Sequence, residues 1–153
     1  MHYNEELNVH FMSHKDAFPF VNKYATPQTL GIDRMVLAAG ATLQYPNQNR
    51  LVIDAGTCIT YDFVNSKDEY LGGAISPGIK IRYKSLNDYT SKLPLLKLTE
   101  DEFLIGDSTK NSIHSGIING VIFEIEGFIS QYSLKNQDLT IILTGGDAIF
   151  LAK

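Results

Sequence analysis

The sequence predicts a mixed α/β fold in which helices flank an antiparallel three-strand meander and one further strand. Three observations support this fold class. Short apolar or alternating runs, separated by turn residues, lie between residues 50 and 76. Apolar residues recur at helical spacing before this region and again from residue 113 to residue 128. A last apolar run, residues 139–143, ends at a Thr-Gly-Gly turn.

The elements before the meander are a strand, a connector and a helix. Residues 7–12 alternate apolar and polar side chains and predict a weak strand, and residues 17–21, which contain a proline, predict a connector. Pro27 prevents a helix from starting much before it. The apolar positions from Leu30 onward therefore predict a helix that ends near Tyr45.

The meander consists of three predicted strands. Leu51-Val52-Ile53 is a short buried run that stops at residues 54–57, and residues 59–64 alternate with Ile59, Tyr61 and Phe63 on one face. Asn65 to Asp68 has the composition of a turn and leads into a third strand, residues 70–76.

Helices and one strand follow the meander. Residues 79–86 predict a helix, with Pro77 suited to its first turn. Ser108-Thr109 is typical of a helix start, and the apolar spacing continues this helix to Leu134. Residues 139–143 predict a buried strand, and residues 148–151 begin another helix.

Composition excludes several classes of protein. The 153 residues fit one ordinary domain, and 44% hydrophobic and 20% charged residues are typical of globular chains. The formal net charge of -4, without a dense run of Lys or Arg, argues against nucleic acid as a partner. Cys58 is the only cysteine, which excludes an intramolecular disulfide and a multi-cysteine zinc site.

The same survey predicts a cytoplasmic protein without a membrane partner. A single cysteine is compatible with a reducing compartment. No apolar run approaches the roughly 18 residues of a spanning helix. The first six residues are polar and lack the layout of a signal peptide.

The segment Asp54-Ala55-Gly56-Thr57 places an acid at the end of a buried strand, followed by a glycine turn and a hydroxyl. Glycine lets backbone N–H groups approach an anion, Thr57 can donate to a phosphate oxygen, and Asp54 can hold a cation. The alternative is a plain hairpin turn, because Asp-x-Gly is also common in turns.

Thr144-Gly145-Gly146 forms a second glycine turn, between an apolar strand and a helix. Such a turn lets a nucleotide lie close to the backbone, although a simple connector is the alternative. Two glycine turns at strand ends, with a meander beside them, resemble the ATPase fold shared by actin, sugar kinases and heat-shock chaperones.

Asp33-Arg34 lies near the start of the first predicted helix. The functional interpretation is that Asp33 takes a proton from a substrate hydroxyl while Arg34 binds a carboxylate. The structural interpretation is a solvated ion pair or an acid matched to the helix dipole, and spacing alone favours it.

Taken together, these segments resemble the ordered motifs of type III pantothenate kinases from about Tyr24 to the C-terminus. In chain order they are Tyr24-x-x-Pro27-x-x-Leu30-Gly31-Ile32-Asp33-Arg34, Ile53-Asp54-Ala55-Gly56-Thr57, Gly72-Gly73-Ala74-Ile75-Ser76-Pro77-Gly78, Leu93-Pro94, Ile105-Gly106-Asp107-Ser108-Thr109 with Ser115-Gly116 and Gly120, and Thr144-Gly145-Gly146.

The resemblance implies a ribonuclease H-like, actin-like ATPase fold, of which this chain would form the incomplete second domain of a two-domain kinase. Residues 1–23 would be the tail of the N-terminal ATPase domain, and residues 24–153 a C-terminally truncated domain that binds substrate and nucleotide. Members of this family open with an Asp-x-Gly-Asn-Thr phosphate loop, which nothing before Tyr24 matches. We therefore expect a fragment with weak or absent kinase activity on its own.

The activity implied is ATP-dependent phosphorylation of pantothenate to 4′-phosphopantothenate, the first step of coenzyme A biosynthesis, by a homodimer. It needs ATP, Mg²⁺ and a monovalent cation, K⁺ or NH₄⁺. The resemblance makes Asp33 the general base and Asp54 the ligand of the monovalent cation. The residues that would contact pantothenate are Tyr24, Gly31, Ile32, Asp33, Arg34 and, across the dimer interface, Thr109. Those that would contact ATP are Gly56, Thr57, Thr144, Gly145 and Gly146.

Two other functions stay open at this point. One is a catalytically incomplete, dimeric ligand-binding or regulatory module of the same fold. The other is a kinase or ATPase of this fold that acts on a sugar or a different acid. Asp33 and Arg34 discriminate best between the three, because only the first needs both a base and a partner for the pantothenate carboxylate.

Overall fold

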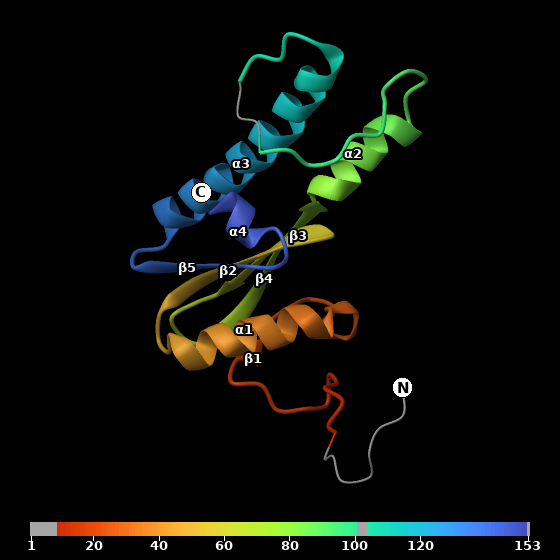
Figure 1. Ribbon diagram of the computed structural model, residues 1–153. Helices are drawn as coiled ribbons and strands as arrows, with labels where there is room; N and C mark the ends of the chain where they lie inside the picture. The colour runs from red at the N-terminus through yellow and green to blue at the C-terminus, as the bar shows by residue number, and fades with distance from the viewer. Residues whose placement is uncertain (1–8, 101–103, 153) are drawn as a thin grey trace.

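The computed structural model describes residues 9–100 and 104–152, and its described part is built on one five-stranded sheet in the order β1-β4-β3-β2-β5 (Figure 1). Strands β2 (Asn49–Ala55), β3 (Cys58–Val64) and β4 (Glu69–Pro77) form the predicted antiparallel meander. β5 (Leu139–Thr144) pairs parallel with β2, and the short β1 (Val21–Asn22) pairs parallel with β4. The mixed α/β class is confirmed.

The main helices cover opposite faces of the sheet (Figure 1). A 3-10 turn, η1 (Pro27–Thr29), precedes α1 (Ile32–Gln44), which packs on β2 and β3. α2 (Ile79–Asp88) packs on the long helix α3 (Thr109–Lys135), which covers the other face, and α4 (Ala148–Leu151) follows β5. These helices confirm those predicted from the spacing of apolar residues.

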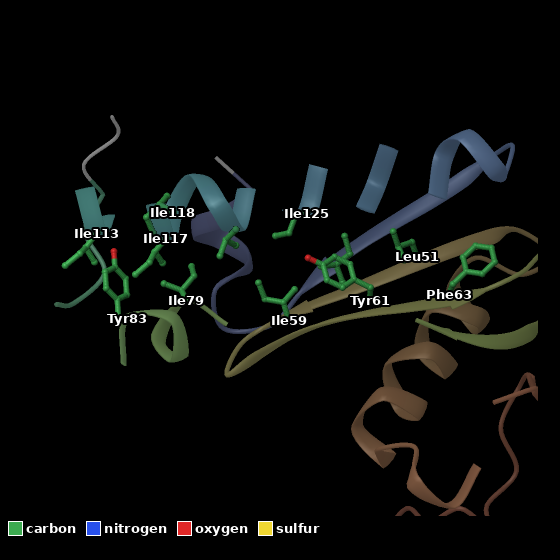
Figure 2. Packing of buried hydrophobic residues seen from close by; sticks show 12 residues of the cluster. Leu51, Ile59, Tyr61, Phe63, Ile79, Tyr83, Ile113, Ile117, Ile118 and Ile125 are labelled. Atoms are coloured by element: carbon green, nitrogen blue, oxygen red, sulfur yellow. The ribbon is translucent and has the colours of Figure 1, made fainter. Parts of the chain in front are cut away.

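Alternation along the strands divides the core into two clusters. On the α3 face, a large cluster joins residues of β2 and β3 to α2 and α3 (Figure 2). Its labelled members are Leu51, Ile59, Tyr61, Phe63, Ile79, Tyr83, Ile113, Ile117, Ile118 and Ile125. On the α1 face, a smaller cluster contains Phe20, Leu30, Met35, Ala38, Val64 and Tyr70. The predicted common face of Ile59, Tyr61 and Phe63 is confirmed.

The start of α3 follows from its first residues. Ser108 is the N-cap, and its Oγ accepts a hydrogen bond from the backbone N–H of Asn111 at 3.2 Å. This bond satisfies one of the N–H groups that lack a partner inside the helix. The predicted helix start at Ser108-Thr109 is therefore confirmed.

Two predictions about elements are wrong. Residues 9–12 are not a strand, and the rest of that prediction, residues 7 and 8, lies outside the described residues. The edge of β4 pairs instead with β1, where Val21 N–H donates to Asp68 O (2.8 Å) and Lys23 N–H to Tyr70 O (2.9 Å). Pro77 does not open α2 but ends β4 opposite Cys58, and Gly78 is the N-cap of α2.

Residues on both sides of the predicted domain boundary at residues 23 and 24 share one packed cluster. Phe20 packs with Leu30 and Met35, and β1 joins the sheet through β4. The boundary itself stays a prediction. No helix in the described part of the chain is both long and apolar enough to span a membrane.

Candidate functional site

The two glycine turns lie side by side at one end of the central strands. In the register of the sheet, Asp54 of β2 pairs with Thr60 of β3 on one side and with Thr144 of β5 on the other. The turn after β5 is held to the end of β2, because Asp147 N–H donates to Ala55 O at 2.9 Å. The parallel pairing of β2 and β5 thus brings together two motifs that are far apart in the sequence.

The glycines of these turns have different surroundings. Gly145 has a φ of +97°, and a Cβ there would collide with Ala55 O and with Oδ1 of Asp54. A Cβ on Gly56 or Gly146 would instead meet no atom within 4 Å. Gly145 is therefore required by the fold, whereas Gly56 and Gly146 leave open backbone beside Asp54 that a ligand can approach.

The start of α1 reaches the same end of the sheet. Asp33 is exposed in the first turn of α1, where an acidic side chain matches the helix dipole, as the structural interpretation expected. Its carboxylate lies close enough to Asp54 to act on the pKa of that residue. A Cβ on Gly31 would collide with Oδ1 of Asp33, so glycine leaves the space that the carboxylate occupies.

Asp54 carries an unfavourable negative charge. Burial raises the pKa of its carboxyl group, and the nearby carboxylates of Asp33 and Asp62 raise it further. Among residues 9–100 and 104–152, no group donates a hydrogen bond to the side-chain carboxylate of Asp54. A cation at this position would relieve the repulsion between the three carboxylates.

Asp62 is a residue of this site that sequence reasoning missed. It is fully buried on β3, and its Oδ1 accepts hydrogen bonds from Arg34 Nε (2.9 Å), Arg34 Nη2 (2.6 Å) and the hydroxyl of Tyr70 (2.5 Å). Thr60 Oγ1 donates to Oδ2 at 3.0 Å. A signal was present in the sequence, because Asp62 is the only charged residue in the alternating run 59–64.

This network changes the interpretation of Arg34. The expected solvated ion pair is wrong for this residue, because its guanidinium group is buried and its partner is Asp62. Burial lowers the pKa of Arg34, but the hydrogen bonds and charge of Asp62 raise it above its ordinary value. Burial, with the hydrogen bond to Asp62, also raises the pKa of the Tyr70 hydroxyl.

Tyr24 lies next to the network. Its ring meets that of Tyr70 edge-on, with 6.1 Å between the centroids, and its side chain lies close enough to Arg34 to contribute to the raised pKa of the guanidinium group. Gly72, with a φ of +109°, leaves room for the ring, because a Cβ there would lie 3.1 Å from Tyr24 Cδ2. The structure thus brings Tyr24, Arg34, Asp33 and Asp54 to one region on the α1 face of the sheet.

The remaining predicted site residues have three different locations. Ile32 is half-buried and packs against the cluster beneath α1. Thr57 is exposed in the first glycine turn, where its carbonyl accepts a hydrogen bond from Gly78 N–H at 3.0 Å. Thr109 is exposed at the start of α3, on the opposite face from α1, and lines a groove with Arg82 and Ile113. Within one chain, Thr109 is therefore not part of the group around Asp33.

Metal coordination by side chains alone finds no support in the described ranges. No group of three or more His, Cys, Asp or Glu side chains there could hold a metal ion. A cation at Asp54 would need further ligands, such as backbone carbonyls, water or phosphate oxygens.

Comparison with known sequences identifies a close group of relatives. Residues 2–131 match the family described as type III pantothenate kinase. A type III pantothenate kinase from Flavobacterium johnsoniae is 64% identical over 151 residues, covering 99% of this chain and 62% of the relative. One from Flavobacterium psychrophilum is 59% identical over 151 residues, covering 99% of this chain and 63% of the relative. The chain thus spans less than two thirds of the length of these relatives.

Comparison with solved structures points to a similar fold. A crystal structure from Campylobacter jejuni, described as a Baf family transcriptional activator, matches with a TM-score of 0.58 and 30% sequence identity. The match covers 88% of this chain and 57% of the other.

Proposed function

Because this chain belongs to the type III pantothenate kinase family, we propose that it provides the pantothenate-binding surface and part of the ATP-binding surface of such a kinase. The reaction transfers the γ-phosphoryl group of ATP to pantothenate and gives 4′-phosphopantothenate, which enters coenzyme A biosynthesis. The observation that carries the proposal is the proximity of Asp33 to Asp54, beside two glycine turns. Phosphoryl transfer needs positioned reactants and stabilised charge more than covalent chemistry. The two turns and Asp33 would position the reactants, and a cation at Asp54 would supply the charge stabilisation.

Asp33 is the proposed general base. Its carboxylate is exposed at the first turn of α1, so it can reach the primary hydroxyl of a bound pantothenate and accept its proton as the oxygen attacks phosphorus. Arg34 is the proposed partner of the pantothenate carboxylate. Nε and one N–H of Nη2 already donate to Asp62. The pantothenate carboxylate would therefore accept hydrogen bonds from the remaining N–H groups of the guanidinium.

The two glycine turns are the proposed nucleotide site. Gly56 and Gly146 leave backbone open to the phosphates and adenosine, Gly145 shapes the turn between them and Asp54, and Thr57 and Thr144 are the proposed hydroxyl donors. Asp54 is the proposed ligand of a monovalent cation, K⁺ or NH₄⁺, because its carboxylate lacks a donor and lies near two other carboxylates. When bound, this cation and Mg²⁺ would offset the charge of the phosphates.

The proposed fold is ribonuclease H-like. Its support is the antiparallel meander β2-β3-β4, followed by the helices α2 and α3 and by β5, which is parallel to β2. We also propose a homodimer. Thr109 begins α3 and Asp33 lies in α1, on the opposite face of the sheet, so we expect Thr109 to contact the pantothenate of a second copy.

Calorimetric titration of the chain tests the proposal at the level of binding. We expect pantothenate to bind, glucose not to bind, and panthenol, in which an alcohol replaces the carboxylate, to bind about tenfold more weakly. Arg34→Ala should remove the preference for pantothenate over panthenol. Equal heats for pantothenate and glucose, or no heat with pantothenate, would refute it.

A regulatory binding module is the second candidate, and the similarity to the Campylobacter jejuni structure favours it. Asp33→Asn separates the two functions. In a full-length context, a binding module would be indifferent to this change, whereas a kinase would lose pantothenate-dependent transfer of phosphate from labelled ATP and keep its pantothenate affinity within about threefold.

A further inference from the structure

Asp62 is a buried charge that the proposed reaction does not use directly. It lies in the middle of β3, paired with Val52 of β2 and Gly73 of β4, and its side chain faces α1. Its side chain has no exposed surface. Buried carboxylates of this kind are rare unless they are paired and hydrogen-bonded.

The partners of Asp62 come from three different elements. Arg34 belongs to α1, Tyr70 to β4 and Thr60 to β3, and together they donate four hydrogen bonds to its two oxygens. Two charge-assisted hydrogen bonds from one guanidinium group to the same oxygen hold the Arg34 side chain against Asp62. Asp62 therefore fixes the first turn of α1 relative to the sheet.

Two of these partners lead directly to the candidate site. Arg34 is the neighbour of Asp33 in the first turn of α1, and Tyr70 packs edge-on against Tyr24. Stability alone is a weak reason for such a network, because apolar residues of similar volume often replace buried ion pairs without loss. A more specific role for the Asp62 carboxylate is to orient Asp33 and Tyr24 through Arg34 and Tyr70.

A second ion pair in the same sheet offers a comparison. Arg50 is fully buried on β2 and donates to Asp68 Oδ1 at 2.7 Å and to Tyr45 O at 2.9 Å. This pair lies at the other end of α1, by its C-cap Tyr45, and contacts none of the candidate site residues. It resembles the Asp62 pair in chemistry and differs from it in location.

We propose that Asp62 is a positioning residue, which holds Arg34 and Tyr70 so that Asp33 and Tyr24 face the phosphoryl acceptor. The proposal rests on the proposed function for the identity of that acceptor, pantothenate. It predicts that loss of the Asp62 charge loosens the first turn of α1. It also predicts that this loss weakens the binding of pantothenate more than the binding of nucleotide.

Amide hydrogen exchange and calorimetry of the whole chain test the proposal. The Met35 N–H, bonded to Gly31 O at 3.2 Å, reports on the first turn of α1, and the Tyr45 N–H, bonded to Ala41 O at 2.9 Å, reports on its end. In Asp62→Asn we expect about tenfold faster exchange at Met35 relative to Tyr45. We also expect about tenfold weaker pantothenate binding, with the affinity for a non-hydrolysable ATP analogue within about twofold.

Asp68→Asn is the matched control. It removes the charge from the other ion pair and should leave both the relative exchange at Met35 and the pantothenate affinity unchanged. An equal loss of pantothenate affinity in Asp68→Asn and Asp62→Asn would overturn the proposal, because it would mean general destabilisation. Weaker binding in Asp62→Asn without faster exchange at Met35 would also overturn it.

Tyr70→Phe provides a milder change if Asp62→Asn does not fold. It removes one of the hydrogen bonds to Asp62, and we expect roughly threefold changes in both readouts. No change in either would overturn the proposal. If the unaltered chain does not bind pantothenate, the proposed function fails, and relative exchange at Met35 in these variants still decides whether Asp62 positions α1.

Discussion

The carboxylate of Asp33 occupies space that a side chain at residue 31 would need. A Cβ on Gly31 would collide with its Oδ1 atom, although the backbone of Gly31, with φ -59° and ψ 136°, suits any residue. The requirement for glycine there is therefore a requirement of the Asp33 side chain. Gly31 is an N-cap without a side-chain hydrogen bond, and it leaves the space that fixes the position of Asp33, the proposed base.

Gly31→Ala should displace the Asp33 carboxylate and weaken pantothenate binding about tenfold. The loss of stability should be no more than about 1 kcal/mol, the difference between glycine and alanine as a helix cap. Gly40→Ala is the control in the same helix, because a Cβ there meets nothing within 4 Å. It should gain up to about 1 kcal/mol and bind as before. Calorimetry and urea unfolding of both variants measure these effects.

The raised pKa of Asp54 gives a second prediction for single residues. Burial is its largest cause, and the charge of Asp33 is the next. Asp33→Asn removes that charge, so the pKa of Asp54 should fall toward its ordinary value. Carboxyl ¹³C NMR of the chain across acidic pH measures this. An unchanged Asp54 titration would mean that the two carboxylates are not neighbours in solution.

The sign of the effect on stability follows from the same shift. A carboxyl group whose pKa is higher in the folded than in the unfolded chain contributes stability below its unfolded pKa, and this contribution is lost as the pH rises through the folded pKa. Asp54→Asn should therefore gain stability relative to the unaltered chain as the pH rises from acidic to neutral.

Single residues also mark the limit of what the sequence predicts. Asp54, Gly56 and Thr144 were identified because glycine turns after apolar runs are local patterns. Asp62 was missed because its partner Arg34 belongs to α1, and alternation alone places a strand residue on the opposite face without saying what covers that face. The partner of a buried charge is a property of tertiary structure.

At the scale of elements, the parallel pairing of β2 with β5 assembles the proposed nucleotide site. Gly145 lies against Asp54 and Ala55, and Gly146, the next residue, borders open space. Neighbouring glycines in one turn thus have separate roles, one in the fold and one toward a ligand.

Gly145→Ala and Gly146→Ala should therefore differ. Alanine at Gly145 is strained by its positive φ and by the collision with Ala55 O, so it should cost more than about 1 kcal/mol. Alanine at Gly146 should change the free energy of unfolding by less than about 0.5 kcal/mol. It should weaken the binding of an ATP analogue about tenfold. Urea unfolding and calorimetry give the two values. Equal losses of stability would show that both glycines serve the fold.

Local sequence patterns predicted most helices and strands, and they failed where the pairing between strands determines whether a strand forms. The meander, α1, α3 and β5 follow from apolar spacing and turn composition. The predicted strand at residues 7–12 was wrong over its described part because alternation does not provide a partner strand, and two residues of β1 took the edge of β4 instead. Strand pairing depends on the rest of the sheet.

At the scale of the whole molecule, one sheet carries both hydrophobic clusters. The larger cluster packs on the α3 face and the smaller on the α1 face, and neighbouring residues of β3, Phe63 and Val64, belong to one cluster each. Loss of packing on either face removes support from the same strands. The candidate site on the α1 face thus depends on the core beneath α3.

This shared sheet predicts that the described chain unfolds as one cooperative unit. Met35→Ala in α1 and Ile117→Ala in α3 each truncate a buried side chain and should each cost about 2–5 kcal/mol. In both variants, the amide NMR signals of α1 and α3 should disappear at the same urea concentration, lower than in the unaltered chain. The two changes are on opposite faces, so each serves as the control for the other. If Met35→Ala released α1 while α3 kept its signals, the smaller cluster would be an independent unit, and the Asp33 side of the site would be free to move relative to Asp54.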